Sequence, residues 1–159
     1  MTKTDVHSLR FCLFWIYLMA IIKEAALTVS SYIESAENKE DFEKSETRAD
    51  AFIKDSGDSL TLSYLEEQQG DRIFTDVTLE NGTVEVKRRG GIECDFLFKE
   101  GESTYSKYAV GPYCFDASIY TKKIRGAITR TGGTLTIFYD MEIGGDKRSV
   151  RMKIEAECK

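Results

Sequence analysis

The sequence predicts an all-β protein in which about eight to ten antiparallel strands form a closed or nearly closed up-and-down barrel. Three observations lead to this prediction. Apolar residues recur at every second position over almost all of the chain after residue 25, as they do in strands with one buried face. Short turn sequences such as Asn81-Gly82 and Gly90-Gly91 separate these runs and join neighbouring strands directly. A meander of this length tends to close, because closure removes both edge strands.

Length and composition are those of one globular domain. The 159 residues are enough for a sizeable core, and apolar and charged residues make up ordinary shares of 42% and 31%. The formal net charge is −5, whereas proteins that bind nucleic acid usually carry a basic stripe and have a high pI. We therefore expect no nucleic-acid partner. Pro112 is the single proline, so no proline-rich linker divides the chain.

The chain begins with an apolar stretch that differs from the rest. Phe11 to Ile22 contains no charge, but it is shorter than the roughly twenty residues that span a bilayer. Lys3 and Arg10 precede it, as in the basic part of a signal peptide. However, Lys23-Glu24 follows at once and no clean cleavage site closes the stretch. No stable membrane span is expected.

We predict that residues 1–24 are an N-terminal extension and that residues 25–159 are a single barrel domain. Three interpretations of the extension stay open. In the first, Met19 is the true start of a cytoplasmic protein and the residues before it, including the only histidine, His7, are a mis-assigned start. In the second, residues 11–22 are a signal or anchor of an exported protein. In the third, they form a hydrophobic helix of the fold. A cytoplasmic location is the leading expectation.

The predicted strands follow one another at short intervals. The first begins near Ala25 and alternates to Ile33. Phe42 to Lys54 has a composition that favours a helix, yet it alternates, and we predict a long exposed strand there. Residues 122–128 are predicted to hold one helical turn. The remaining alternating runs are Leu60–Glu66, Ile73–Leu79, Val84–Arg88, Ile92–Phe98, Thr104–Val110, Phe115–Thr121, Leu135–Ile143 and Val150–Ala156.

The chain contains no recognisable catalytic or metal-binding motif. Without His7, no Ser/His/Asp or Cys/His arrangement is available, and the common nucleotide and zinc motifs are absent. We therefore predict a protein without enzymatic activity, cofactor or metal; an enzyme that uses carboxylates alone is the weak alternative. No CxxC pair occurs, so free thiols in a reducing cytosol are expected for Cys12, Cys94, Cys114 and Cys158.

Polar residues share the inward parity of two strands. Tyr64 and Glu66 alternate with the apolar residues of one strand, and Arg88 with Val84 and Val86 of another. An unpaired buried charge is costly, so the carboxylate and the guanidinium either pair or meet a ligand. The first interpretation is a structural ion pair at the barrel end. The second is a ligand-binding site for an anionic or polar head group, with the hydroxyls of Tyr64, Tyr108 and Tyr139 as further partners.

Aromatic residues also lie on the predicted outward faces. Single exposed aromatic side chains are normal, but several together can form an interface. Two interpretations stay open: a homodimer interface, or cover by the N-terminal segment or flanking loops. These residues are Tyr32, Phe52, Phe74, Tyr120 and Phe138.

The chain resembles the bacterial YwiB-like family, also called the domain of unknown function 1934 family, over about residues 25–157. The resemblance lies in the order and spacing of several motifs rather than in one of them. These are Leu62-Ser-Tyr-Leu-Glu-Glu67, Val84-Glu-Val-Lys-Arg-Arg-Gly90, Phe98-x-x-Gly101, Tyr108 followed by Gly111-Pro-Tyr113, Thr121-x-x-Ile124 and Gly133-x-Leu-x-Ile-x-Tyr139.

The resemblance implies a calycin-like, or lipocalin-like, β-barrel and no known reaction. It also implies a small protein that starts just before the first strand, which favours Met19. One position departs from the family, which usually has glycine after the Pro-aromatic pair where this chain has Cys114. Cysteine would be strained at a positive φ, so the loop is expected to run differently.

The leading functional hypothesis is a non-enzymatic barrel that binds a small apolar or amphipathic ligand in its interior. The alternative is a structural or protein-interaction module with a solidly packed barrel and no ligand. The extent to which bulky inward side chains fill the interior decides between the two hypotheses, because an eight-stranded barrel can be filled by side chains alone.

Overall fold

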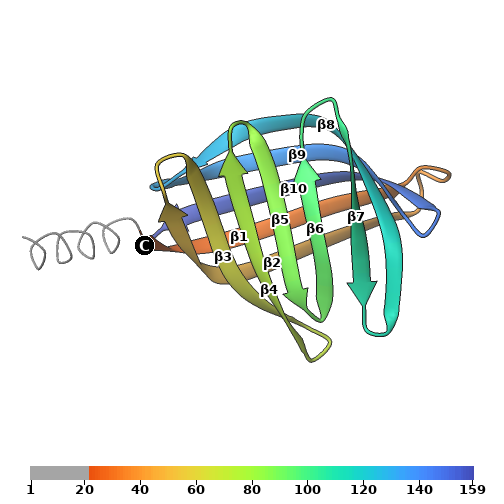
Figure 1. Cartoon of the computed structure of the whole chain (residues 1–159), viewed down its shortest axis with the longest axis horizontal. Helices are drawn as coiled ribbons and strands as arrows, with labels where there is room; N and C mark the ends of the chain where they lie inside the picture. Colours follow the sequence, from red (N-terminus) through yellow and green to blue (C-terminus); the bar gives the residue numbers. More distant parts are fainter. Residues whose placement is uncertain (1–21) are drawn as a thin grey trace, which may run out of the picture.

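A computed structural model describes residues 22–159 and shows an antiparallel barrel of ten strands (Figure 1). Each strand pairs with the next in sequence, and β1 also pairs with β10, so the ring is closed. The predicted closed all-β barrel is confirmed. The strands are β1 (Ile22–Ser35), β2 (Phe42–Asp55), β3 (Ser59–Gln68), β4 (Asp71–Glu80), β5 (Thr83–Gly90), β6 (Ile92–Phe98), β7 (Ser103–Val110), β8 (Tyr113–Thr129), β9 (Gly132–Ile143) and β10 (Asp146–Cys158).

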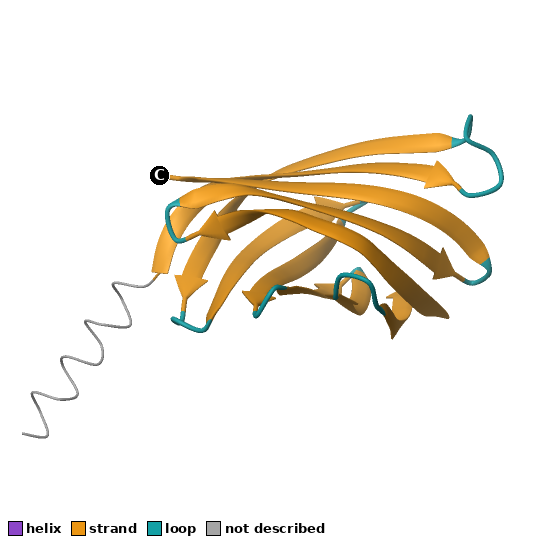
Figure 2. Ribbon diagram, turned by 90° about the horizontal axis from the view of Figure 1, so that it is seen from above, coloured by secondary structure: helices purple, strands orange, loops and turns teal. Residues whose placement is uncertain are grey.

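The strands form two layers that cross. In Figure 1, the long strands β1, β2, β9 and β10 run across the picture, and the shorter β3 to β7 run in front of them at a steep angle. Figure 2 shows the layers from above, with loops only at the strand ends. β8 starts beside β7 and ends beside β9, so it belongs to both layers. Such corner strands are typical of orthogonally packed sheets.

The helical turn predicted for residues 122–128 is wrong. This segment is part of β8, and its partners are residues of β9. The register shifts between Thr121 and Lys123, which is a β-bulge. A bulge adds one residue to the strand and changes the alternation from that point on. The alternation of inward and outward residues is therefore interrupted in the sequence at this bulge, and the pattern does not predict a strand there.

The predicted turns and the predicted strand at residues 42–54 are confirmed. Asn81 and Gly82 have φ values of 50° and 74°, as a type I′ turn requires. In the turn before Pro112, Gly111 takes the positive φ, 56°, whereas Cys114 lies in β8 opposite Ala109. Cys114 is therefore unstrained, and the chain needs no glycine at this position.

A hydrophobic core occupies one end of the barrel. Its largest side chains point inward from every layer and are at most 2% exposed. This tightly packed end explains why the alternating pattern is strict there, because each polar substitution would bury an unsatisfied group. The residues include Leu27, Ile53, Leu62, Val77, Val84, Phe98, Leu135, Ile137 and Ile154.

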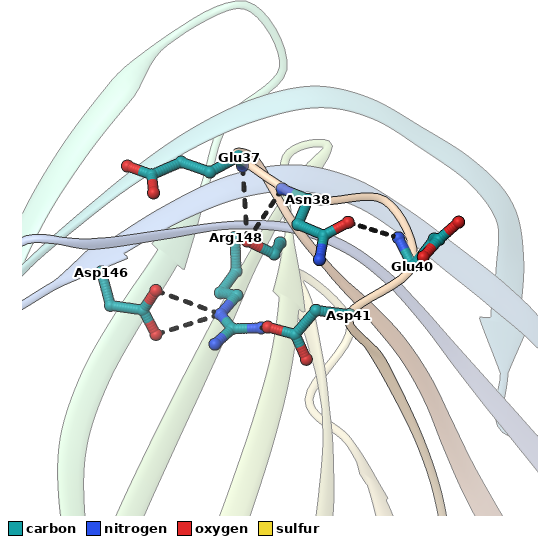
Figure 3. A network of polar contacts seen from close by, with 7 residues as sticks. Glu37, Asn38, Glu40, Asp41, Asp146 and Arg148 are labelled. Atoms are coloured by element: carbon teal, nitrogen blue, oxygen red, sulfur yellow. Dashed lines mark hydrogen bonds and ion pairs between the residues drawn. The ribbon is translucent and has the colours of Figure 1, made fainter.

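A polar network holds the loop between β1 and β2 (Figure 3). The Arg148 guanidinium on β10 donates to Asp41 in this loop at 3.1 Å and to Asp146 at 3.0 Å. Within the loop, the Asn38 side chain accepts from the backbone N–H of Glu40 at 3.1 Å. The network fixes the loop to the turn between β9 and β10 at the same end of the molecule.

The predictions for the N-terminal extension fall mostly outside the described residues. Met19, His7 and Cys12 lie in this part of the chain, and so does most of the apolar stretch. The described chain begins at Ile22, and β1 starts there, ahead of the predicted Ala25. Within residues 22–159, no helix is long and apolar enough to cross a membrane.

Candidate binding site in the barrel

Five inward side chains form a row across neighbouring strands at the less tightly packed end of the barrel. Tyr64 on β3 lies opposite Thr75 on β4, which lies opposite Arg88 on β5. Arg88 in turn lies opposite Cys94 on β6, and Cys94 opposite Tyr108 on β7. The tight hairpin at Asn81-Gly82 sets the alignment of Thr75 with Arg88, because a two-residue turn leaves no freedom for a slip.

Arg88 and Glu66 form an ion pair inside the barrel. Nη2 of Arg88 donates to Oε1 of Glu66, and the side chains are 22% and 7% exposed. Nε of Arg88 is buried and has no hydrogen-bond partner among residues 22–159. Since a buried guanidinium N–H without an acceptor costs free energy, the group has one unused donor for a ligand or water.

A cavity of about 240 Å³ lies beside this pair. All five residues predicted for the site line it, from strands that are far apart in the sequence: Tyr64, Glu66, Arg88, Tyr108 and Tyr139. The other lining residues are Val29, Ser31, Ile33, Ser45, Thr47, Gln68, Val86, Phe96, Phe98, Met141, Ile143 and Met152. The cavity thus has one polar side around Arg88 and an apolar side built by β1, β9 and β10.

The cavity lies where β2 and β3 separate. Their pairing covers only Ala51–Asp55 with Leu60–Tyr64. Ser45 and Thr47 on β2 and Glu66 and Gln68 on β3 line the cavity beyond the last of these pairs. The strand pairing that would close the wall is therefore missing beside the cavity.

The tyrosines around the cavity are kept neutral. Burial, and after it the nearby Glu66 carboxylate, raises the pKa of Tyr64 to about 12, while Arg88 opposes the shift. Burial also raises the pKa of Tyr139 and of Tyr108. Neutral phenols can both donate and accept a hydrogen bond, so these hydroxyls suit a polar ligand group better than they suit a catalytic base.

Two buried threonines are part of the site region but were not predicted for it. Thr75 and Thr121 are 1% and 0% exposed, and their hydroxyls have no partner in the described part of the chain. Thr75 lies between Tyr64 and Arg88, and Thr121 lies opposite Tyr139. Their inward parity was visible in the sequence, but threonine is common in strands and so is not a distinctive signal.

At alkaline pH, buried Cys94 and Tyr64 are expected to destabilise the barrel. Burial raises the pKa of Cys94 from 9.0 to about 11 and that of Tyr64 from 10.0 to about 12. The unfolded chain therefore loses these protons first. Below pH 9.0 neither group lowers the free energy of unfolding. As the pH rises from 9.0 to about 12, the free energy of unfolding falls by roughly 3 kcal/mol for each group.

Urea denaturation over this pH range tests the expectation. Above pH 10.0, residue 64 ionises only in the unfolded chain when it is tyrosine. Replacing Tyr64 with phenylalanine should therefore make the free energy of unfolding fall less steeply in this range. Tyr105→Phe is the control, because this side chain is 81% exposed and its ring is not buried by folding. An equal pH dependence in Y64F and the unmodified protein would contradict the assignment.

The described residues contain no group of three or more His, Cys, Asp or Glu side chains that could hold a metal ion. Cys94, Cys114 and Cys158 are free thiols, and Cys94 is buried. Cys94 lies opposite Arg88, but its raised pKa keeps it as a thiol. The site therefore offers hydrogen bonds, one ion pair and apolar contacts.

Comparison with known proteins places these features in a family. Residues 28–154 match the family model described as "Domain of unknown function (DUF1934)". The "Uncharacterized beta-barrel protein YwiB" of Bacillus subtilis (strain 168) is 31% identical over 121 residues, which are 76% of this chain and 83% of that protein. The crystal structure of ywiB protein from Bacillus subtilis has a TM-score of 0.79 at 29% identity and covers 92% of this chain and 99% of that chain. The protein is therefore a member of the DUF1934 family, a family of uncharacterised β-barrel proteins.

Proposed function

We propose that this barrel binds a small amphipathic ligand in the cavity beside Arg88. The observation that carries the proposal is the buried Nε of Arg88, which faces no acceptor among residues 22–159 although its guanidinium lies at the cavity wall. A buried polar group of this kind is normally satisfied, and a ligand oxygen would satisfy it.

The size of the cavity limits the ligand. Typical small-molecule sites have volumes of roughly 300–1,000 Å³, so a cavity of about 240 Å³ takes a ligand at the small end of this range. Met141 and Met152 line its apolar side together with Ile33. Methionine side chains are flexible and adapt to irregular shapes, so this side fits an apolar tail without requiring one tail shape.

The polar side favours a neutral acceptor over an anion. Glu66 already neutralises Arg88, and a second carboxylate beside it would meet repulsion in a poorly solvated place. An amide, ester or hydroxyl oxygen would accept from Nε without this penalty. Tyr64 and Tyr108 would supply further hydrogen bonds, because both are neutral at physiological pH.

The proposed activity is binding without chemistry. The one inward carboxylate at the cavity, Glu66, is held by Arg88, and the phenol of Tyr64 loses its proton only near pH 12. The Tyr64 phenol is therefore not poised to transfer a proton near neutral pH. A reducing, cytoplasmic location suits the exposed free thiol of Cys114. The calycin-like assignment of the barrel and a homodimer remain predictions.

The alternative is a barrel without a ligand, in which the Arg88–Glu66 pair only holds strands together. The dense packing of Leu62, Ile137 and Phe98 next to the cavity favours this alternative, because it shows that much of the interior is filled by side chains. The two functions differ in one measurable property, the presence of a bound molecule in the purified protein.

Native mass spectrometry of the purified protein tests the proposal. We expect a mass above that of the chain alone, and we expect E66L/R88L to lack the additional mass because it has no polar anchor. The control is R89L/D95L, which removes a similar ion pair of 2.7 Å from the outer face and should keep the ligand. A bare mass for the unmodified protein would argue for the barrel without a ligand. The same additional mass in E66L/R88L would contradict the proposed anchor at Arg88.

A further inference from the structure

A row of alternating cations and aromatic rings crosses the outer face of the barrel, away from the cavity. We call it the cation–aromatic row and define it as Lys123 on β8, Phe138 on β9, Arg151 on β10, Tyr32 on β1 and Lys44 on β2. Each of these residues lies directly opposite the next in the strand register. The row therefore crosses five neighbouring strands without interruption.

The aromatic rings of the row hold the cations in place. The Arg151 guanidinium lies 5.6 Å from the centre of the Tyr32 ring, and Nζ of Lys44 lies 5.8 Å from it. At the other end, the guanidinium of Arg125 lies 5.6 Å from the Phe138 ring. Contacts of this kind stabilise a cation by about 0.5–1 kcal/mol at an exposed site and restrict its motion.

The cations of the row lack the acidic partners that neighbouring cations have. Beside the row, Lys122 pairs with Asp140 at 2.9 Å and Lys153 with Glu155 at 2.8 Å. By contrast, no carboxylate of residues 22–159 lies within ion-pair distance of the cations in and next to the row. These are Lys44, Lys123, Arg125 and Arg151.

A groove of about 680 Å³ follows the row. Its lining includes four members of the row, Tyr32, Lys44, Phe138 and Arg151, together with Lys153, but not Lys123. The one carboxylate among the described residues of the lining, Glu46, pairs with Arg48 at 2.8 Å. Strands in a sheet lie about 4.8 Å apart, so a row across five strands is about 19 Å long. An extended peptide advances about 3.3 Å for each residue and would cover this length with about six residues.

We propose that the cation–aromatic row binds an extended acidic segment of a partner protein. The unpaired cations complement glutamate or aspartate side chains, and guanidinium groups such as Arg151 can donate two parallel hydrogen bonds to one carboxylate. The chain as a whole has a net charge of −5, so this local excess of cations would orient the acidic segment toward one face.

The same row is less suited to single-stranded nucleic acid. Such binding uses aromatic faces that are free to stack on bases. Here Arg125 covers the Phe138 ring, and Arg151 and Lys44 lie over the Tyr32 ring, which also stacks on Phe42 with ring centres 5.7 Å apart. The row therefore offers held cations rather than free stacking surfaces.

Fluorescence anisotropy with a labelled peptide of alternating glutamate and alanine tests the proposal. We expect saturable binding that weakens as salt is added, because exposed charges are screened. R125T/R151T should bind about tenfold more weakly, since two exposed charge contacts of about 0.7 kcal/mol each are lost. The matched control is R72T/K87T, which removes two cations from strands β4 and β5 of the other layer and should bind as the unmodified protein does.

A second measurement uses only the unmodified protein and so does not depend on the folding of a variant. Bound peptide should protect Lys44 and Lys123 from acetylation but leave Lys87 reactive. The proposal would be overturned by absence of peptide binding, by equal losses in the two double variants, by equal protection of all three lysines, or by tighter binding of an oligothymidine than of the acidic peptide.

Discussion

Replacing Gly90 with alanine is expected to lower the free energy of unfolding by about 3–5 kcal/mol. Gly90 has a φ of +110°, which residues with a side chain rarely adopt, and it ends β5 two residues after Arg88. An added Cβ would lie 2.1 Å from the backbone oxygen of Arg72, so one of the two strands would have to move. Backbone, unlike a flexible side chain, gives way only at the expense of strand pairing.

Urea denaturation of G90A measures this effect, and G82A is the matched control. Gly82 also has a positive φ, +74°, but a Cβ there would meet nothing within 4 Å. In G82A the free energy of unfolding should therefore fall only by the cost of a positive φ at a residue with a side chain, about 1 kcal/mol. If the two variants were equally stable, the contact between Gly90 and Arg72 would not limit the packing of β4 against β5.

Removing one member of the inward ion pair is the second change with a large expected effect. In E66L the Arg88 charge stays in the barrel without its partner, and in R88L the Glu66 charge does. A buried charge without a partner typically costs 3–5 kcal/mol. Because Arg88 keeps some contact with solvent, we expect about 2–4 kcal/mol for E66L. The Glu66 charge left in R88L is more deeply buried, so about 3–5 kcal/mol is expected for that variant.

The double variant E66L/R88L should recover most of this loss, because it leaves no buried charge and adds apolar surface. Denaturation of the four proteins forms a double-mutant cycle, and a coupling energy of at least about 2 kcal/mol is expected. R89L/D95L and its single variants provide the comparison, because that pair is about half exposed and should show a coupling below about 1 kcal/mol. Additive effects of E66L and R88L would mean that the two side chains do not depend on each other.

Much of the fold could be predicted because one physical rule applies along the whole chain. Side chains of a strand alternate between two faces, so the parity of Val84 and Val86 also placed Arg88 inside. The Asn81-Gly82 dipeptide then fixed how β4 and β5 align. The same parity argument placed Tyr64 and Glu66 on the inner face, where the structure has them.

The remaining features depend on contacts that a strand pattern does not contain. The bulge between Thr121 and Lys123 interrupts the alternation, and a one-residue shift is not distinguishable locally from a helical turn. The separation of β2 from β3 follows from how the two layers cross rather than from either strand alone. The meeting of Tyr139 with Arg88 around one cavity likewise depends on closure of the ring.

The pairing of β1 with β10 has a consequence for how the protein forms in the cell. Eleven residue pairs join Ala25–Ser35 to Arg148–Cys158, so the first strand finds its second neighbour only when the last strand is present. Until β10 is in place, β1 and β9 would each expose an unpaired edge. Such edges can pair with other chains, and bringing distant strands together is slow. Ring closure by β10, rather than the formation of any single hairpin, is then the step that removes the edges open to aggregation.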